Sequence, residues 1–249
     1  MSNIFIGKNI IRLHEVDSTN THAQQLLREG RVFDGTLILA ESQSSGRGQR
    51  GNTWETEPGK NWIGSFVLYP HFLSPAEGYW LTLIAGMAIL KALKSFGFKG
   101  VVKWPNDVLA EGDKKKVCGI LTETTIRSGK VEHAIVGIGM NVNQTAFSLP
   151  QATSLCNELG DKIPLENITD ELSVSFENYY LKLKNGKKED LLNDYYQSLY
   201  GYGRQLDFRD FSGRDFEGII RGINQHGHLL VESDAGLIAY GMKEISFVF

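Results

Sequence analysis

The sequence predicts an α+β fold, in which a mixed β-sheet domain with packed helices is followed by a small β-barrel. Over residues 1–199, apolar runs of strand length alternate with longer helical periods. Residues 200–249 instead contain close-set short strands separated by Gly, Asp, Ser and Asn, with no helical period. A chain of 249 residues with 41% hydrophobic and 22% charged residues is long enough to bury a full core. We therefore expect two units, with a boundary near Leu199.

The first half of the chain supplies two helices between strands. Residues 17–20 offer several N-cap side chains for a helix that Gly30 ends. Residues 77–96 carry apolar side chains at the spacing of a long helix with a wide buried face. Strands are expected at residues 10–15, 36–40, 61–69 and 101–102.

The second half begins with a hairpin. Residues 117–126 and 131–142 are rich in Val, Ile and Thr, and Ser128-Gly129 marks the turn between them. Helices are expected at residues 153–159, 169–183 and 189–199. The strands of the terminal barrel are expected at residues 204–208, 216–223, 228–233, 237–241 and 244–249.

Charge and composition exclude several classes of protein. A net charge of −3 and a pI of about 6.1 provide no basic field for nucleic acid or an anionic membrane. Cys118 and Cys156 lack metal-type spacing, so buried free thiols in a reducing cytoplasm are expected. The N-terminus has no signal-peptide pattern, and the apolar run at residues 81–90 is too short to span a bilayer. We expect a cytoplasmic protein that is not bound to a membrane.

Residues 46–51 satisfy the Gly-x-Gly-x-x-Gly pattern of dinucleotide-binding proteins. That pattern requires a helix immediately after the loop, but residues 52–59 have no apolar period and contain a Pro-Gly break. A P-loop is excluded too, because no Gly-Lys-Ser/Thr follows. The loop is better interpreted as a flexible segment in which Arg47 and Arg50 present guanidinium groups to phosphate. A solvated surface loop is the alternative.

Three further segments combine cations, amides and glycines. Residues 103–107 (Lys-Trp-Pro-Asn-Asp) follow a strand, and either serve phosphate and Mg²⁺ or form a turn with an Asn-Asp cap. Lys116 ends a lysine run that is otherwise solvated. Gly137 and Gly139 share one face of a strand and leave a flat slot that ends at Asn141.

Residues suited to nucleophilic or metal chemistry are scarce. His226-x-His228 has no evident third metal ligand, and no Gly-x-Ser-x-Gly motif or Cys/His pair is present. The polar segments above therefore favour charge stabilisation at phosphates, as in phosphoryl or nucleotidyl transfer.

The order and spacing of these motifs resemble the biotin protein ligases, the biotin–[biotin carboxyl carrier protein] ligases, from about residue 10 to the C-terminus. The matching residues are Ser18-Thr19-Asn20, Gln43-x-x-Gly46-Arg47-Gly48, Trp54, Lys103-Trp104-Pro105-Asn106-Asp107, Lys116-x-x-Gly119-Ile120-Leu121 and Gly137-x-Gly139-x-Asn141.

The resemblance implies a fold and a reaction. The fold is a catalytic domain of the class II synthetase and biotin-ligase type, followed by an SH3-like barrel. The reaction has two steps. Biotin and ATP, with Mg²⁺, first give biotinyl-5'-AMP and pyrophosphate, and a lysine of a biotin carboxyl carrier domain then takes the biotinyl group. No tightly bound cofactor is implied.

The resemblance also implies roles for particular residues. Lys116 meets the biotin carboxylate or the adenylate carbonyl, Trp54 stacks on adenine, and Asp107 is a candidate Mg²⁺ ligand. The catalytic cations are Arg47, Arg50, Lys103 and Lys116. The biotin site comprises Ser18, Thr19, Asn20, Gln43, Gly46, Lys116, Gly119, Gly137 and Gly139. The adenylate site comprises Arg47, Gly48, Gln49, Trp54, Lys103, Asn106, Asp107 and Asn141.

Two departures from the family pattern matter. Many relatives have Gly-Arg-Gly-Arg, whereas this chain has Gln49 in place of the second arginine. Only about ten residues precede the first strand, so we expect neither the helix-turn-helix of repressor-type members nor DNA binding. Exposed sheet edges would allow a homodimer or pairing with the carrier protein.

Two other functions are less consistent with the sequence. A lipoate–protein ligase shares the chemistry, but the Lys-Trp-Pro-Asn-Asp and Gly-Ile-Gly-Met-Asn motifs argue against it. A nucleic-acid reader barrel would need paired basic and aromatic residues, which the last fifty residues hardly contain.

Overall fold

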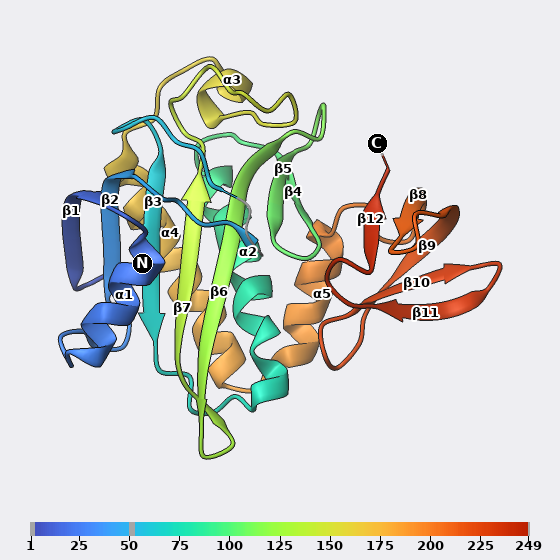
Figure 1. The fold of residues 1–249 in the computed structure, drawn as a ribbon, viewed down its shortest axis with the longest axis horizontal. Helices are drawn as coiled ribbons and strands as arrows, with labels where there is room; N and C mark the ends of the chain where they lie inside the picture. The colour runs from blue at the N-terminus through green and yellow to red at the C-terminus, as the bar shows by residue number, and fades with distance from the viewer. Residues whose placement is uncertain (1–2, 50–52, 249) are drawn as a thin grey trace.

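The computed structural model describes residues 3–49 and 53–248, which form two β-sheets and a layer of helices (Figure 1). The strands of the seven-stranded main sheet are β1 (Ile10–Val16), β2 (Leu37–Gln43), β3 (Trp62–Leu68), β4 (Gly100–Lys103), β5 (Asp107–Ala110), β6 (Lys116–Arg127) and β7 (Lys130–Met140). The helices are α1 (Thr19–Arg28), η2 (Pro75–Glu77), α2 (Tyr79–Lys94), α3 (Leu155–Leu159), α4 (Leu165–Lys184) and α5 (Lys188–Ser198).

The main sheet has the strand order β1-β2-β3-β7-β6-β5-β4. Only the β1–β2 pair among these described strands is parallel, and every other neighbouring pair is antiparallel. The long β6–β7 hairpin lies at the centre and turns at Ser128, which has the positive φ of 50° that such a turn requires. This confirms the predicted hairpin and puts both glycine-containing strands next to each other.

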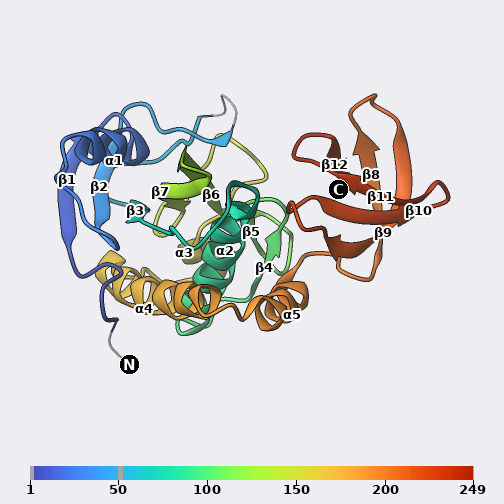
Figure 2. The same cartoon turned by 90° about the horizontal axis from the view of Figure 1, so that it is seen from below.

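Helices cover the two faces of the main sheet unequally (Figure 2). The larger hydrophobic core lies beneath α2 and α4, and includes Phe66, Phe176 and Tyr180, which are at most 1% exposed. A smaller core lies beneath α1, where Ala23 and Leu26 pack on Ile38 and Val67. Because α1 covers only one end of its face, the rest of that face is left to loops and to the candidate site.

The apolar character of α2 follows from its position inside the fold. Its residues from Trp80 to Leu93 are nearly all buried against β4 to β7 and α4. By length and composition residues 75–94 would also suit a membrane span, but 61% of that window is buried within the protein. The core accounts for the apolar sequence of this helix.

The C-terminal residues form a separate five-stranded antiparallel sheet in the order β11-β10-β9-β8-β12. Its strands are β8 (Gln205–Asp210), β9 (Asp215–Ile223), β10 (Leu229–Ser233), β11 (Gly236–Tyr240) and β12 (Ile245–Phe247). The predicted all-β unit is present, but its SH3-like barrel form is not confirmed, because no pairing closes the sheet between β11 and β12 among the described strands.

Hydrogen bonds from β4 and the residue that follows it attach the C-terminal sheet to the main sheet. Tyr200 N donates to Val102 O at 2.8 Å, and Trp104 Nε1 donates to Gly227 O at 2.9 Å. Trp104 is 4% exposed, so its indole fills the junction and its donor is satisfied there. The two units therefore meet at the edge where residues 103–107 lie.

Several predicted boundaries differ from the structure. The helix predicted at 169–183 begins one turn earlier, at Leu165 after Pro164, and the helix predicted from residue 153 begins after its N-cap Ser154. Residues 107–110 form β5, which was not predicted because the segment is only four residues long. Asp107 therefore starts a strand, and does not end a loop.

A buried carboxylate fixes the first described residues. Glu177 of α4 is 4% exposed and accepts hydrogen bonds from the backbone N–H groups of Ile4, Phe5 and Ile6 at 2.5, 2.7 and 2.8 Å. These three donors compensate the cost of burying the charge. The start of the described chain is thereby attached to the helical layer.

We expect Glu77→Gln to lower the free energy of unfolding by about 1–2 kcal/mol at pH 7. Hydrogen bonds from Lys188 and then from Ser74 lower the pKa of the Glu77 carboxyl from its ordinary value of 4.5 to about 2. Because the folded pKa is below the unfolded one, this stabilisation is complete above about pH 4.5 and is lost as pH falls towards 2.

Urea unfolding between pH 2 and 8 measures this dependence. The difference between Glu77→Gln and the unchanged protein should narrow below pH 4.5. The matched control is Glu189→Gln, an exposed position of α5, which should change stability by less than about 0.5 kcal/mol. A difference that stays constant over the whole range contradicts the role given to the Glu77–Lys188 pair.

Candidate functional site

One row of residues crosses five strands of the main sheet. The strand pairings align Lys103 with Asp107, Asp107 with Gly119, Gly119 with Gly139, and Gly139 with Ile63. Residues directly opposite each other in antiparallel strands point to the same face. The row therefore runs from a charged end, over two adjacent glycines, to an apolar residue, on the face that α1 only partly covers.

A second row lies beside the first. It aligns Leu121, Gly137 and Ser65 on β6, β7 and β3. The two rows together form a floor without side chains at three positions, because Gly119, Gly137 and Gly139 have no Cβ. This is the slot that the glycine spacing of β7 predicted, enlarged by the glycine of β6.

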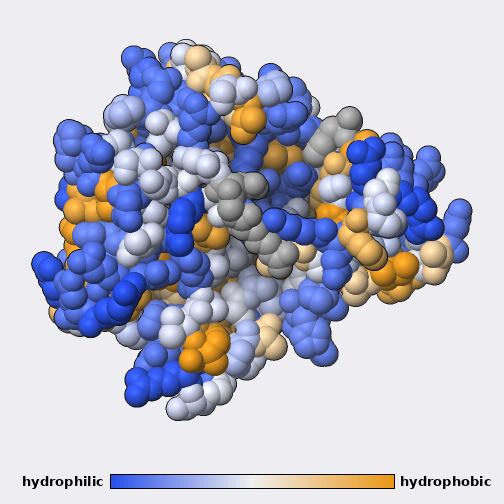
Figure 3. Space-filling view, viewed as in Figure 1, coloured by the Kyte–Doolittle hydropathy of each residue, from blue (hydrophilic) through white to orange (hydrophobic). Residues whose placement is uncertain are grey.

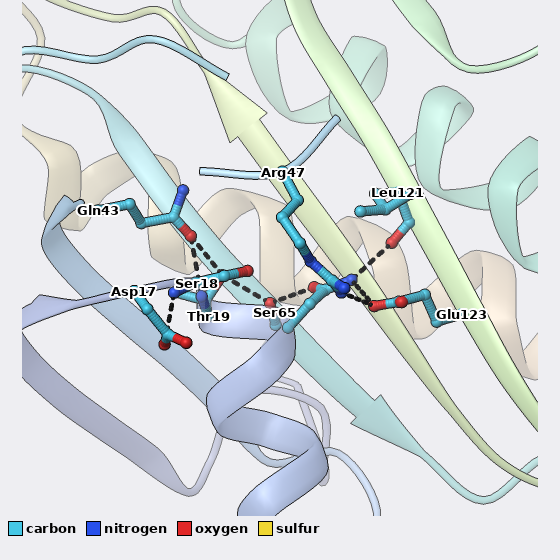
Figure 4. Close-up of polar contacts among 9 residues, drawn as sticks. Asp17, Ser18, Thr19, Gln43, Arg47, Ser65, Leu121 and Glu123 are labelled. Carbon is cyan, nitrogen blue, oxygen red and sulfur yellow. Dashed lines mark hydrogen bonds and ion pairs between the residues drawn. The ribbon is translucent and has the colours of Figure 1, made fainter. Parts of the chain in front are cut away.

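Hydroxyl and amide groups border the floor at the start of α1 (Figure 4). Ser65 Oγ donates to Asn20 Oδ1 at 2.6 Å, and its oxygen lies 2.7 Å from Thr19 Oγ1. Gln43 Oε1 accepts from the backbone N–H of Thr19 at 2.8 Å. Ser18, Thr19 and Asn20 are at most 4% exposed. This cluster carries donors and acceptors but no charge, so it suits a neutral polar ligand.

Glu123 connects this cluster to the arginine loop. Its Oε2 accepts from Asn20 Nδ2 at 2.7 Å and from Arg47 Nη2 at 2.6 Å. Figure 4 shows Arg47 extending from its loop across the floor to Glu123 on β6. The Arg47 guanidinium is thus held by a carboxylate over the pocket.

The segment that begins at Gly46 lies against residues 53 and 54. Trp54 N donates to Gly46 O at 2.9 Å, and Arg47 pairs with Thr53. A Cβ on Gly46 would lie 2.5 Å from Trp54 O, so the close approach of the two backbones requires glycine. Gly46 therefore shapes the loop, and Arg50 lies outside the described residues.

The indole of Trp54 lies in the glycine slot. A Cβ on Gly139 would be 2.5 Å from Trp54 Cε2, and one on Gly119 would be 3.1 Å from Cζ3. The Lys116 ammonium lies 5.5 Å from the ring centroid, and Trp54 Nε1 is buried without a hydrogen-bond partner among the described residues. The remaining cavity is about 180 Å³, below the roughly 300–1,000 Å³ of most small-molecule sites. A ligand on this floor must therefore displace Trp54.

The charged end of the floor contains a paired cation and anion. Lys116 Nζ lies 2.7 Å from Asp107 Oδ1, and hydrogen bonds of the Lys116 backbone to Gln151 and Thr153 fix that strand end. Asn106 Nδ2 donates to Ile120 O at 2.8 Å, which ties the β4–β5 turn to β6. Asn106 thus has a structural contact as well as a place in the pocket lining.

Lys103 lies beside the charged end and is largely buried. Its ammonium is 5.2 Å from the Phe247 ring centroid of β12. Burial lowers the pKa of Lys103, while Asp107 raises it and Lys116 lowers it. Burial has the largest effect, so the pKa of Lys103 is lowered from its ordinary value although Asp107 opposes the shift.

The structure brings most of the predicted site residues to one pocket. Those that line it are Ser18, Thr19, Asn20, Gln43, Arg47, Gly48, Gln49, Trp54, Asn106, Asp107, Lys116, Gly119, Gly137 and Gly139. Gly46, Lys103 and Asn141 are not among the lining residues. Asn141 is buried, and its Nδ2 donates to Thr153 O at 3.0 Å.

Several residues in or beside the pocket were not predicted, among them Ser65 and Glu123, which hydrogen-bond to lining residues, and Lys243, which is itself part of the lining. Ser65 faces the floor because β3 aligns it with Gly137, which no motif in the sequence indicates. Glu123 lies two residues after Leu121 on β6 and so shares its face, a signal that strand alternation offered. Lys243 comes from the C-terminal sheet and lines the same pocket.

Comparison with known proteins places this pocket in a family. A family model for biotin/lipoate A/B protein ligases matches residues 13–141, which include the polar cluster, the arginine loop and the glycine floor. The chain belongs to the biotin/lipoate A/B protein ligase family. A biotin–[acetyl-CoA-carboxylase] ligase of Paracoccus denitrificans is 30% identical over 244 residues, covering 94% of this chain and 99% of that protein.

Other members of the biotin/lipoate ligase family extend the match over nearly the whole chain. A bifunctional ligase/repressor of Bacillus subtilis is 30% identical over 238 residues, covering 93% of this chain and 72% of that protein. The structure of biotin protein ligase from Aquifex aeolicus in complex with biotin and ATP aligns with a TM-score of 0.79 at 27% identity, covering 97% of this chain and 99% of that one. The mixed α+β fold of this ligase family is therefore shared.

A metal site built from protein ligands is not evident in this family member. Residues 3–49 and 53–248 contain no group of three or more His, Cys, Asp or Glu side chains arranged to hold a metal. His226 and His228 have ring centroids 6.2 Å apart but no third ligand of these types. Asp107 is the carboxylate of the floor row, and it is paired with Lys116.

We expect Gly139→Ala to expel the Trp54 indole from the slot, because the new Cβ would lie within 2.5 Å of the ring. In protein labelled with 5-fluorotryptophan, the Trp54 ¹⁹F resonance, identified with Trp54→Phe, should shift while the other three tryptophans stay unchanged. Gly112→Ala is the matched control, since its Cβ meets no atom within 4 Å. An unmoved Trp54 resonance in Gly139→Ala would contradict the position of the ring.

Proposed function

We propose that this chain is an ATP-dependent biotin protein ligase, which forms biotinyl-5'-AMP and transfers biotin to a lysine of a biotin carboxyl carrier domain. The observation that carries the proposal is the floor itself, with neutral hydroxyls and amides at one end and Asp107, Lys116 and Lys103 at the other. Biotin has the same polarity, an uncharged ureido ring at one end and a carboxylate at the other. The relatives named as biotin ligases support this substrate.

The proposed ureido site is the cluster around the start of α1. Ser18, Thr19 and Gln43 donate to and accept from the ureido ring, and Asn20 belongs to the same site. The bicyclic ring lies on Gly137 and Gly139, where a side chain at either position would collide with it, and the Gly119 backbone contributes a further polar contact. A ring without charge needs no counter-ion here, which fits a cluster of hydroxyls and amides.

In the proposed first step, a biotin carboxylate oxygen attacks the α-phosphorus of ATP. The bond from that phosphorus to the bridging oxygen breaks, and pyrophosphate leaves with the electron pair. Lys116 exchanges its contact with Asp107 for the carboxylate and the developing adenylate, while Arg47 exchanges Glu123 for phosphate. Both cations are already at the pocket before substrate binds, so each needs only to exchange one anionic partner for another.

In the proposed second step, the amine of the carrier lysine attacks the carbonyl of the mixed anhydride and AMP leaves. No nucleophile from this chain is required. Trp54, once displaced from the slot, is available to stack on adenine, with Gly48, Gln49 and Asn106 beside the nucleotide. The loop would then also exclude water from the anhydride.

Mg²⁺ would arrive with ATP in this proposal. A magnesium–nucleotide complex is commonly held by one or two carboxylates and the substrate phosphates. Asp107 supplies one such carboxylate at the charged end of the floor, so the residues present fit a metal shared with ATP. The ion would supply neutralisation of phosphate charge.

The proposed acceptor is the carrier domain of a biotin-dependent carboxylase, because relatives at 30% identity are named biotin–[acetyl-CoA-carboxylase] ligases. The proposal places the enzyme in the cytoplasm, where ATP and the carrier protein are found, and gives it no DNA-binding role. We also propose that the protein forms a homodimer through a sheet edge and that its C-terminal unit has an SH3-like form.

We expect Lys116→Ala to lower biotin-dependent ATP–pyrophosphate exchange by 10²–10³-fold, because it removes the cation closest to the reacting carboxylate. The fold should persist, since Lys116 is partly exposed and its backbone contacts remain. The matched control is Lys115→Ala, which removes an adjacent lysine that pairs with Asp113 and should leave the rate within about twofold.

The same assay tests the substrate. The protein is incubated with Mg²⁺-ATP and either biotin or lipoate, and pyrophosphate release and labelling of a carrier domain are followed. Labelling with biotin supports the proposal. Labelling with lipoate alone overturns it, and full exchange activity in Lys116→Ala overturns the role of that residue.

A further inference from the structure

Lys243 is the one residue of the C-terminal sheet among the described residues that line the pocket. It lies in the turn between β11 and β12, with a φ of 71° that is unusual for a lysine. The turn is fixed by Glu244, whose Oε2 accepts from Gly241 N at 2.6 Å and whose N–H donates to Gly241 O at 3.1 Å. The backbone therefore holds the lysine at a defined point on the pocket rim.

The turn that carries Lys243 is anchored to the charged end of the floor. The strand that follows it, β12, packs its Phe247 ring 5.2 Å from the Lys103 ammonium. Trp104, next to Lys103, donates to Gly227 O of the same unit. Figure 1 shows β12 on the side of the C-terminal sheet that faces β4 and β5. Lys243 thus approaches the pocket from the side of Asp107, opposite the neutral cluster of α1.

The pocket cations differ in their partners. Lys116 is paired with Asp107 and Arg47 with Glu123. Lys243 is exposed, and no carboxylate within residues 3–49 and 53–248 pairs with it. Figure 3 shows that the coloured surface of this face is mostly hydrophilic or intermediate, with small hydrophobic patches. An ammonium at the pocket rim with no internal counter-ion is suited to an anionic ligand.

We propose that Lys243 binds the β- and γ-phosphates of ATP and the pyrophosphate that leaves, as a catalytic residue supplied by the C-terminal sheet. This inference rests on the proposed ligase function. When the bond between the α-phosphorus and the bridging oxygen breaks, the leaving pyrophosphate gains negative charge, and the Lys243 ammonium stabilises that charge. The paired cations Lys116 and Arg47 act at the carboxylate and the α-phosphate.

The test compares Lys243→Ala and Lys243→Arg with the unchanged protein in biotin-dependent ATP–pyrophosphate exchange. For Lys243→Ala, we expect KM for ATP and the inhibition constant of pyrophosphate to rise about tenfold, the loss of one charge-assisted contact. KM for biotin and the thermal unfolding midpoint should stay unchanged. Lys243→Arg should restore most of the loss, and Lys130→Ala, an exposed lysine at the distal end of the β6–β7 hairpin, serves as the control.

A second measurement separates the phosphate role from carrier docking. Preformed biotinyl-5'-AMP bound to Lys243→Ala should transfer biotin to the carrier domain at the unchanged rate. Slower transfer, with KM for ATP and the inhibition constant of pyrophosphate unchanged, overturns the inference. An active Lys243→Ala enzyme in which both constants stay within twofold of the original values also overturns it. If the unchanged protein shows no biotin-dependent exchange, the proposed function fails first, and this inference fails with it.

Discussion

The register of the central antiparallel strands is the constraint on which the site depends. Because β3, β7, β6, β5 and β4 pair without a slip along one row, Ile63, two glycines, Asp107 and Lys103 lie side by side on one face. A shift of one residue between β6 and β7 would turn a glycine away and put a larger side chain into the slot. The large core beneath α2 and α4 holds that register, since the alternate residues of the same strands are buried there.

The sequence predicted the individual strands and helices better than the register in which the strands pair. The β6–β7 hairpin, α1 and α2 follow from alternation, helical period and turn residues, and their residues agree with the structure to within a few positions. The facing of Gly119 and Gly139 depends on register, which no local pattern states. Motif spacing nevertheless identified most of the lining residues, because the motifs lie on or beside the strands and the helix start that surround the floor.

What the sequence could not predict comes from contacts between distant segments. Ser65 belongs to a strand with no motif, and Lys243 belongs to a unit that local patterns separate from the pocket. Lys103 and Asn141 matched family motifs, yet Lys103 packs against Phe247, Asn141 donates to Thr153 O, and neither lines the pocket. The packing of Trp54 in the slot also depends on contacts between distant segments. An indole covers the surface left bare by the glycines more favourably than water does.

The hydrogen bonds from the backbone of Ile4, Phe5 and Ile6 to Glu177 have a practical consequence for immobilising the protein. The first described residues emerge beside α4, on the side of the sheet opposite α1 (Figure 2). A tether coupled at Asn3 would set the helical layer against a chip or bead and leave the glycine floor open to the bulk solution. Immobilisation through that end therefore keeps the binding face accessible to a partner as large as a folded domain.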